Sequence, residues 1–184
     1  MSRLKVFSSR STNVLNTVSD HDQIASELNA IGVRFERWQT GAVLTDSSSQ
    51  EEIIAAYRSS IDALMNEYGF QSVDVIALGP DHPEREMLRK KFLDEHIHSD
   101  FEVRFFVDGK GLFYIHADEQ VFGVMCEKGD LISVPAGAKH WFDMGEAPCF
   151  KCVRLFTTPE GWVADYTGNT IAKSFPTFET FIND

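Results

Sequence analysis

Residues 96–109 read His96-Ile97-His98-Ser99-Asp100-Phe101-Glu102-Val103-Arg104-Phe105-Phe106-Val107-Asp108-Gly109, and this stretch decides the fold and the chemistry of the chain. Side chains two residues apart on a β-strand point to the same face of the sheet. His96 and His98 are therefore expected to aim at one point. Glu102 can join them from the same face, so the stretch predicts a shared site for two imidazoles and a carboxylate.

A second stretch completes this set of polar side chains. Residues 129–140 read Gly129-Asp130-Leu131-Ile132-Ser133-Val134-Pro135-Ala136-Gly137-Ala138-Lys139-His140. The segment 135–137 predicts a sharp turn that brings His140 to the same point from a neighbouring strand. Three imidazoles and one carboxylate form a mixed nitrogen and oxygen donor set, which suits a first-row transition metal. We therefore predict that one metal ion is bound by His96, His98, Glu102 and His140.

The spacing of these residues matches the two sequence motifs of the cupin superfamily. The motifs take the forms His96-x-His98-x3-Glu102-x6-Gly109 and Gly129-x5-Pro135-x-Gly137-x2-His140. The second motif normally ends with an Asn where this chain has Met144, but that Asn is not a metal ligand. The alternative is a cupin that keeps the fold and binds no metal. Such proteins normally lose ligand residues, whereas this chain has all four.

The composition narrows the classes of function. The chain of 184 residues has 28 acidic and 17 basic residues, which gives a net charge of −11. This balance argues against a nucleic-acid-binding surface, which needs a basic patch, and against attraction to an anionic membrane. No apolar run approaches the roughly 18 residues of a membrane span, and the N-terminus lacks the apolar core of a signal peptide. We therefore expect a single cytoplasmic domain, residues 1–184, that is a monomer.

The three cysteines make an odd count, which does not favour a disulfide framework. Cys149 and Cys152 have CxxC spacing, so a redox pair or half a zinc site is an alternative. The chain has no second such pair, and the spacing falls within a strand-like run. We therefore expect Cys126, Cys149 and Cys152 to be buried, reduced thiols.

Helical patterns are concentrated in residues 1–90. We expect one helix between the caps at residues 19–22 and Gly32, a second between the capping box at 49–52 and Gly69, and a third after residue 81. Short strands are expected at residues 4–7, 33–38 and 73–77. From residue 96 onward the pattern changes, and the expected strands are 101–107, 111–116, 121–126, 131–134, 139–142 and 149–156.

Short strands at such regular spacing are typical of an antiparallel sandwich or barrel. Residues 108–111 predict a hairpin turn between the first two of them. The expected fold is therefore mainly β, a cupin (jelly-roll) barrel with helices contributed mostly by the N-terminal half. Residues 91–157 would form the metal-binding barrel core, and residues 158–184 a tail that packs back on it.

Polar residues around the first motif have less specific interpretations. Glu95 and Asp100 flank it, and either is a candidate to orient a ligand imidazole from behind. The remaining histidines match no ligand position. We expect His21 to be an exposed polar residue, His82 to be structural beside a proline, and His116 to lie at a strand end in solvent.

Several further segments resemble the bacterial acireductone dioxygenases of the methionine salvage pathway. These segments are residues 31–38, 91–98, 102–107, 126–137, 140–145 and 161–164. The resemblance implies a cupin fold with one Fe(II) or Ni(II) ion per chain. It also implies an enediol substrate, 1,2-dihydroxy-3-keto-5-methylthiopentene, that reacts with O2. In that family the Fe(II) form yields formate and 4-methylthio-2-oxobutanoate, and the Ni(II) form yields formate, carbon monoxide and 3-methylthiopropionate.

A substrate of this kind gives roles to residues near the predicted metal ligands. Arg104 is two residues beyond Glu102, so it shares the inward face and could pair with a developing oxyanion. A structural salt bridge is the alternative for Arg104. Phe92, Phe142 and Trp162 could form an apolar pocket for the methylthio tail, with plain core packing as the alternative for each.

Two rival functions share the same four ligands. The enzymatic rival is a metal-dependent cupin isomerase, or a cupin dioxygenase of a different substrate, and O2 consumption separates isomerase from dioxygenase. The non-enzymatic rival is a cupin sensor or storage module, which binds a small molecule without turnover.

Overall fold

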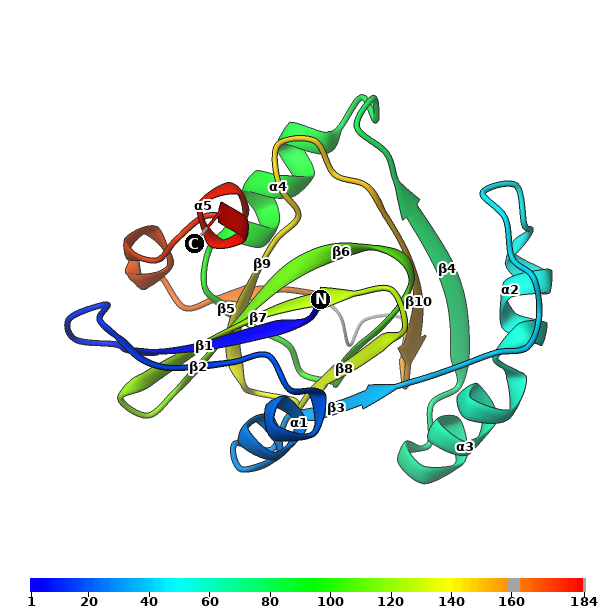
Figure 1. Cartoon of the computed structure of the whole chain (residues 1–184), viewed down its shortest axis with the longest axis horizontal. Helices are drawn as coiled ribbons and strands as arrows, with labels where there is room; N and C mark the ends of the chain where they lie inside the picture. Colours follow the sequence, from blue (N-terminus) through cyan, green and yellow to red (C-terminus); the bar gives the residue numbers. More distant parts are fainter. Residues whose placement is uncertain (159–162, 184) are drawn as a thin grey trace.

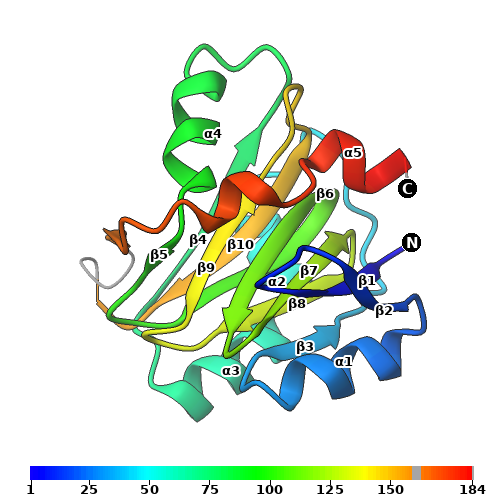
Figure 2. The ribbon, with the colours of Figure 1, turned by 90° about the vertical axis from the view of Figure 1, so that its left-hand side faces the viewer.

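One long strand organises the molecule. The computed structural model describes residues 1–158 and 163–183, and in it β6 (Glu102–Ala117) runs for 16 residues through two antiparallel sheets. The sheets curl towards each other and enclose the interior of a barrel (Figure 1 and Figure 2). The mainly β architecture predicted from the sequence is confirmed.

The two sheets meet at β6. The other strands are β1 (Arg3–Ser8), β2 (Val14–Val18), β3 (Arg34–Arg37), β4 (Ser72–Leu78), β5 (His96–Ile97), β7 (Gln120–Glu127), β8 (Asp130–Val134), β9 (Lys139–Asp143), β10 (Phe150–Phe156) and β11 (Asp165–Tyr166). One sheet has the order β11-β5-β9-β6-β7-β1-β2. The other has the order β3-β8-β6-β10-β4. Each half of β6 therefore belongs to a different sheet.

The inward-facing set of β6 changes halfway along the strand. In the first half, Phe106 packs in the interior cluster and its neighbour Phe105 packs outside. In the second half, Phe113 packs in the interior cluster. The inward positions thus change from even to odd residue numbers. The cause is an extra residue in β6, where the pairing with β10 shifts register, followed by Gly109 at φ +74°. A bulge of one residue turns every later side chain to the other face.

The hairpin turn predicted at residues 108–111 is wrong. β6 is continuous across these residues, and Gly109 supplies a bulge instead of a turn. The neighbouring backbone packs so closely there that a Cβ atom on Gly109 would lie 1.9 Å from the carbonyl oxygen of Cys149 and 2.6 Å from Cα of Phe150. Glycine is therefore required at this position for space as well as for its backbone conformation.

The first two helices begin at the predicted capping residues. The carboxylate of Asp20 accepts a hydrogen bond from the backbone N–H of Gln23 at the start of α1 (His21–Asn29). Ser49 and Glu52 form the predicted capping box of α2 (Gln50–Ala56). Each cap satisfies backbone donors that have no partner within the helix.

The single helix expected from residue 49 to residue 69 is divided in two. Tyr57 has φ −113° and ψ 15°, which separates α2 from α3 (Arg58–Tyr68). The phenol ring of Tyr57 is buried edge-on against Phe105, at 4.5 Å between ring centroids. The break therefore accompanies the packing of both short helices on the same sheet. Gly69 ends α3 in the left-handed conformation, as predicted.

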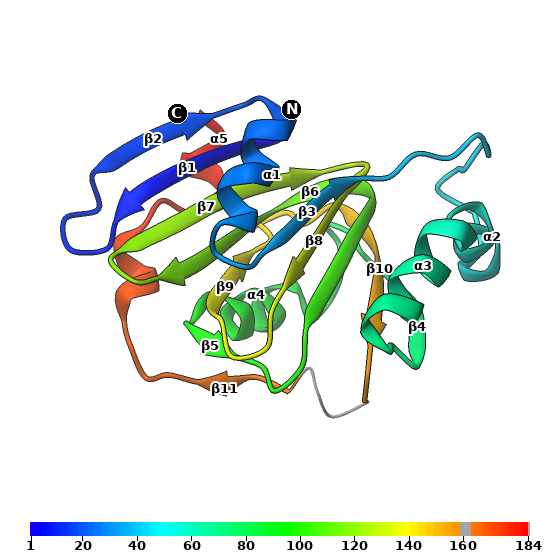
Figure 3. The same cartoon turned by 90° about the horizontal axis from the view of Figure 1, so that it is seen from below.

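Some helices cover the outer faces of the two sheets, whereas α1 and the helix at residues 85–93 pack against the interior cluster (Figure 1 and Figure 3). α1 packs beside β3, and α2 and α3 cover the β4–β10 side. α4 (Arg85–Leu93) packs against β9. The C-terminal elements η1 (Ile171–Ser174) and α5 (Phe178–Asn183) lie on the other sheet, where Phe175 and Phe181 are buried against Phe7 and Tyr114. Four of these helices come from the N-terminal half, as predicted.

The cysteines are free, but one of them is not buried as expected. Cys126 and Cys152 are buried, whereas Cys149 is exposed. Burial raises the pKa of Cys152 to about 12 and that of Cys126 well above its ordinary value. Both buried thiols therefore stay protonated and unreactive near neutral pH.

Among the residues that the structure describes, the helices are too short or too polar to cross a lipid bilayer.

The bulge in β6 makes a prediction about stability. The variant Gly109→Ala should lower the free energy of unfolding by about 3 kcal/mol or more, because its Cβ atom collides with backbone that cannot move aside. Urea denaturation of the purified protein measures this loss.

Gly69→Ala is the matched control. Gly69 has the same φ of +74°, but nothing lies within 4 Å of its Cβ position. Only the conformational cost of about 1 kcal/mol should appear there. Equal losses in the two variants would show that the close approach at Gly109 contributes nothing.

Candidate metal centre

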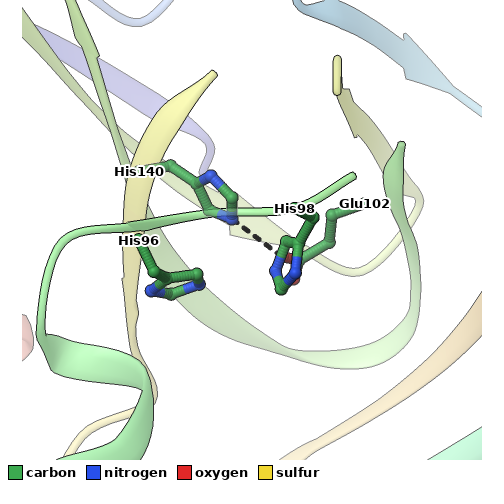
Figure 4. A group of neighbouring side chains, drawn as sticks. All are labelled: His96, His98, Glu102 and His140. Carbon is green, nitrogen blue, oxygen red and sulfur yellow. Dashed lines mark hydrogen bonds and ion pairs between the residues drawn. The ribbon is translucent and has the colours of Figure 1, made fainter. Parts of the chain in front are cut away.

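The four predicted ligands come together at one end of the barrel interior. His96 lies in β5 and pairs directly with His140 in β9, Glu102 begins β6, and His98 lies in the loop between β5 and β6. Figure 4 shows the three rings and the carboxylate converging. One donor atom from each residue lies within 4.8 Å of the donor atoms of the other three. Segments far apart in sequence thus supply one compact cluster.

Backbone carbonyl groups fix the orientation of all three imidazoles. Nδ1 of His96 lies 2.7 Å from the carbonyl oxygen of Asp94, and Nδ1 of His140 lies 2.8 Å from that of Ala138. Nδ1 of His98 lies 3.1 Å from the carbonyl oxygen of Val163. A carbonyl can only accept, so each Nδ1 carries a proton. Each Nε2 is left to face the centre of the cluster, which is the arrangement of metal-binding histidines.

The contacts of Glu102 show that these residues fit a metal ion. One oxygen of its carboxylate, Oε2, lies 2.9 Å from Nε2 of His98 and 2.9 Å from Nε2 of His140. With Nδ1 of His98 and of His140 protonated, Nε2 of each neutral ring turns a lone pair towards this carboxylate, and a bound cation relieves the repulsion between them. Donor atoms at adjacent positions of a six-coordinate ion, with bonds near 2.1 Å, are about 3 Å apart. One divalent cation therefore satisfies the observed spacing.

The electrostatics of the cluster favour the deprotonated donors that a metal requires at two of the four residues, His96 and Glu102. Burial, and then the charge of His140, lower the pKa of His96 to about 4, so this ring is neutral near pH 7. Burial would raise the pKa of Glu102, but the charge of Arg104 and the adjacent imidazoles of His140 and His98 hold it well below its ordinary value. His98 differs. Burial lowers its pKa, but the hydrogen bond and charge of Glu102 outweigh burial and raise it.

Arg104 combines a salt bridge with an unused donor. Its Nε donates to Oε1 of Glu102 at 2.8 Å, and its guanidinium carbon lies 4.6 Å from the ring centroid of Phe142. The rings of Phe92 and Phe113 also face it, at 5.5 and 5.7 Å. Within the described residues, Nη1 of Arg104 is buried without a hydrogen-bond partner. Because an unpaired buried donor costs free energy, this atom has unused capacity to bind an oxygen atom.

A cavity of about 160 Å³ adjoins the cluster. Arg104, Glu102, His96 and His98 form its polar wall. Phe92 and Phe142 line it, as predicted, and Trp162 lies outside the described residues. The remaining lining residues are Lys91, Val103, Arg154, Phe156, Val163, Ala164 and Tyr166. The cavity can therefore hold a small molecule that is polar at one end and apolar at the other.

Sequence reasoning missed the lining residues beyond Trp162 and on β10. Arg154 of β10 lies opposite Arg104 of β6 in the strand register. The guanidinium of Arg154 donates hydrogen bonds of 2.9 and 2.6 Å to the carboxylate of Asp74. The signal was an arginine between Val153 and Leu155 in a mostly apolar strand. Val163 and Tyr166 belong to a segment without periodicity, so no pattern indicated them.

Glu95 and Asp100 do not contact the ligand imidazoles. Oε2 of Glu95 lies 2.6 Å from Nδ1 of His116, and the side chain of Glu95 is fully buried. His116 is therefore not in solvent as expected, and 13% of its side chain is exposed. Asp100 accepts hydrogen bonds from Phe101 and Thr157, which tie the loop before β6 to the end of β10.

His21 is also less exposed than expected, because its ring stacks on Phe35 at 4.9 Å between centroids. His82 accepts a hydrogen bond from the backbone N–H of Glu84, which fits the structural role that was expected for it. Neither residue approaches the metal cluster, whose members are the four predicted ligands.

The family model described as "ARD/ARD' family" matches residues 4–164. The chain belongs to the ARD/ARD' family. It is 56% identical over 183 residues to the acireductone dioxygenase of Aquifex aeolicus (strain VF5), across 100% of both chains. It is 52% identical over 182 residues to the acireductone dioxygenase of Methylococcus capsulatus (strain ATCC 33009 / NCIMB 11132 / Bath), across 99% of this chain and 98% of that one.

A solved structure of this family has the same fold. It is described as "Acireductone dioxygenase from Bacillus anthracis with cadmium ion in active center". It matches 90% of this chain and 98% of its own, with 32% sequence identity and a TM-score of 0.78. The family and the cupin fold predicted from the sequence are therefore confirmed.

The geometry of the cluster makes a prediction for this ARD/ARD' family member. The variants His96→Ala and His98→Ala should each lose tight metal binding, because removing one of four protein ligands leaves an open, weakly held ion. Elemental analysis of the purified variants after dialysis measures the metal content per chain.

His82→Ala is the control, since His82 lies outside the cluster. It should keep the metal content of the unmodified protein. Full occupancy in either ligand variant would rule out that residue as a ligand.

Proposed function

We propose that this chain is an acireductone dioxygenase that cleaves 1,2-dihydroxy-3-keto-5-methylthiopentene with O2 in methionine salvage. His96, His98, Glu102 and His140 hold one Fe(II) or Ni(II) ion per chain. One observation carries the proposal: the four-residue cluster opens onto a cavity where Arg104 offers an unpaired donor. The full-length likeness to proteins named acireductone dioxygenase supports the choice of reaction.

When bound by these four residues, the ion would supply Lewis acidity to the enediol. The protein residues then act on the substrate around it. Nη1 of Arg104 donates to an enediolate oxygen and stabilises the negative charge that makes the substrate electron-rich. The salt bridge from Nε of Arg104 to Glu102 holds the guanidinium in place, so little reorganisation is needed.

The apolar part of the cavity receives the methylthio tail. Phe92, Phe142 and Phe156 lie on its walls, and Val163 and Ala164 line it from the C-terminal segment. These side chains exclude water from the reacting end of the substrate. In a drier site the charge of Arg104 acts more strongly on the enediolate.

The donor set accepts more than one divalent ion. Imidazole and carboxylate suit Fe(II) and Ni(II) alike, and raw affinity favours Ni(II). The cadmium ion in the active centre of the Bacillus anthracis enzyme supports this tolerance. We propose that the Fe(II) form yields formate and 4-methylthio-2-oxobutanoate, and that the Ni(II) form yields formate, carbon monoxide and 3-methylthiopropionate.

Product analysis tests the proposal directly. The metal-free protein is loaded anaerobically with Fe(II) or Ni(II), the occupancy is measured, and the acireductone is added with O2. Both forms should consume O2, and carbon monoxide should appear with Ni(II) alone. Isomerisation of the substrate without O2 consumption would favour the rival isomerase. Binding of the substrate without turnover in either fully loaded form would favour a sensor module.

Substitution of Arg104 tests its role. Arg104→Met fills the space between the phenylalanine rings but removes the charge and the donors. It should keep one metal ion per chain and lower kcat/KM roughly 10²- to 10³-fold, as the loss of a donor to an oxyanion does elsewhere.

Arg104→Lys is the matched variant, because it keeps the charge and loses the planar array of donors. Its rate should fall between those of the unmodified protein and Arg104→Met. An unchanged rate in Arg104→Met would leave Arg104 only its structural salt bridge with Glu102.

A further inference from the structure

We propose that Glu95 is a positioning residue of the metal centre, which acts on His96 from the opposite face of the sheet. Three side chains are involved, Glu95, His116 and Thr167, which we call the Glu95 anchor. None of them contacts the cavity or takes part in the proposed reaction. The inference rests on the proposed function in one respect, the assignment of His96 as a metal ligand.

Every acceptor of Glu95 is used. Its Oε2 contacts Nδ1 of His116 at 2.6 Å, and its Oε1 accepts a hydrogen bond from Oγ1 of Thr167 at 2.7 Å. Its backbone carbonyl accepts from the backbone N–H of Thr167 at 3.1 Å. Glu95 thereby joins three parts of the fold: the start of β5, the end of β6 and the segment after β11. A fully buried carboxylate is tolerated only when it is satisfied in this way.

The alternation of side chains places this anchor directly behind the metal cluster. His96 and His140 pair across β5 and β9, and both face the interior. One step along the ladder, His116 pairs with Lys139, so its side chain lies on the opposite, outer face. Glu95 precedes His96 and shares that outer face. The sheet therefore carries the ligand on one side and its anchor on the other.

β5 has little else to fix its position. It is two residues long, pairs with β9 at one position and pairs with β11 at two. A strand this short has almost no stability of its own. The carbonyl that orients the ring of His96 belongs to Asp94, the residue just before Glu95. Movement of Glu95 would displace both the backbone of His96 and the acceptor that aims its ring.

Thr167 extends the same constraint to a second ligand. It follows Tyr166 of β11, which pairs with His96 of β5. The same segment contains Val163, whose carbonyl oxygen orients the ring of His98. Loss of the Thr167 hydroxyl should therefore loosen the supports of two ligands at once, although it touches neither ring.

The experiment measures Ni(II) affinity by competition with a chelator, together with the thermal midpoint of the metal-free protein. Thr167→Val removes the hydroxyl and keeps the shape, and Thr167→Ser keeps the hydroxyl. Glu95→Gln keeps the size and removes the charge. Ser2→Ala is the matched control, because Ser2 donates at 2.5 Å to another fully buried carboxylate, that of Asp130, which lies outside the cavity.

Thr167→Val and Glu95→Gln should weaken Ni(II) binding roughly ten- to hundredfold, which is the usual effect of losing a residue that supports a ligand. Thr167→Ser should bind Ni(II) as the unmodified protein does. Ser2→Ala should lower the thermal midpoint without changing the affinity. If the Glu95 anchor contributed to stability alone, Ni(II) affinity would not distinguish Thr167→Val and Glu95→Gln from Ser2→Ala. If Glu95→Gln fails to fold, the Thr167 pair decides.

Unchanged Ni(II) affinity in Thr167→Val overturns the proposal. Equal losses of affinity in Thr167→Val and Ser2→Ala also overturn it, because the effect would then follow general stability. Failure of the proposed function looks different. In that case His96→Ala keeps its Ni(II), or the fully loaded unmodified protein leaves the acireductone intact.

Discussion

The close approach of β10 to Gly109 is the constraint on which the rest of the structure depends. It places one extra residue in β6, and that residue reverses which side chains face inward. Before the bulge, β6 turns Glu102 and Arg104 into the interior. After it, the same strand turns Ile115 inward beside His140. Without the reversal, Tyr114 and His116 would face the interior in place of Phe113 and Ile115.

The metal cluster is predictable from the sequence because its geometry is local. His96, His98 and Glu102 are close in the chain, and the turn that delivers His140 is encoded by Pro135 and Gly137. The larger β-strands were also evident from their composition, since their apolar residues form continuous or alternating runs. The family and the reaction rested on resemblance, which the likeness to known acireductone dioxygenases supports over the whole chain.

What the sequence did not reveal depends on contacts between distant residues. The residues around Gly109 have the composition of a hairpin turn. Only the packing of Gly109 against Cys149 shows that the strand continues through a bulge. The burial of His116 depends on its side-chain contact with Glu95, which is 21 residues away in the sequence. β5 and β11 are two residues long, so neither produces a periodic pattern.

The carbonyl of Val163 has a consequence for how the protein is made. The N-terminal part of the chain leaves the ribosome first, and all four ligands precede residue 163. When His140 has emerged from the ribosome, the donor atoms exist, but the acceptor that aims the ring of His98 does not. A site with its final orientation therefore forms only after residue 163 has been synthesised, later than the last of its ligands.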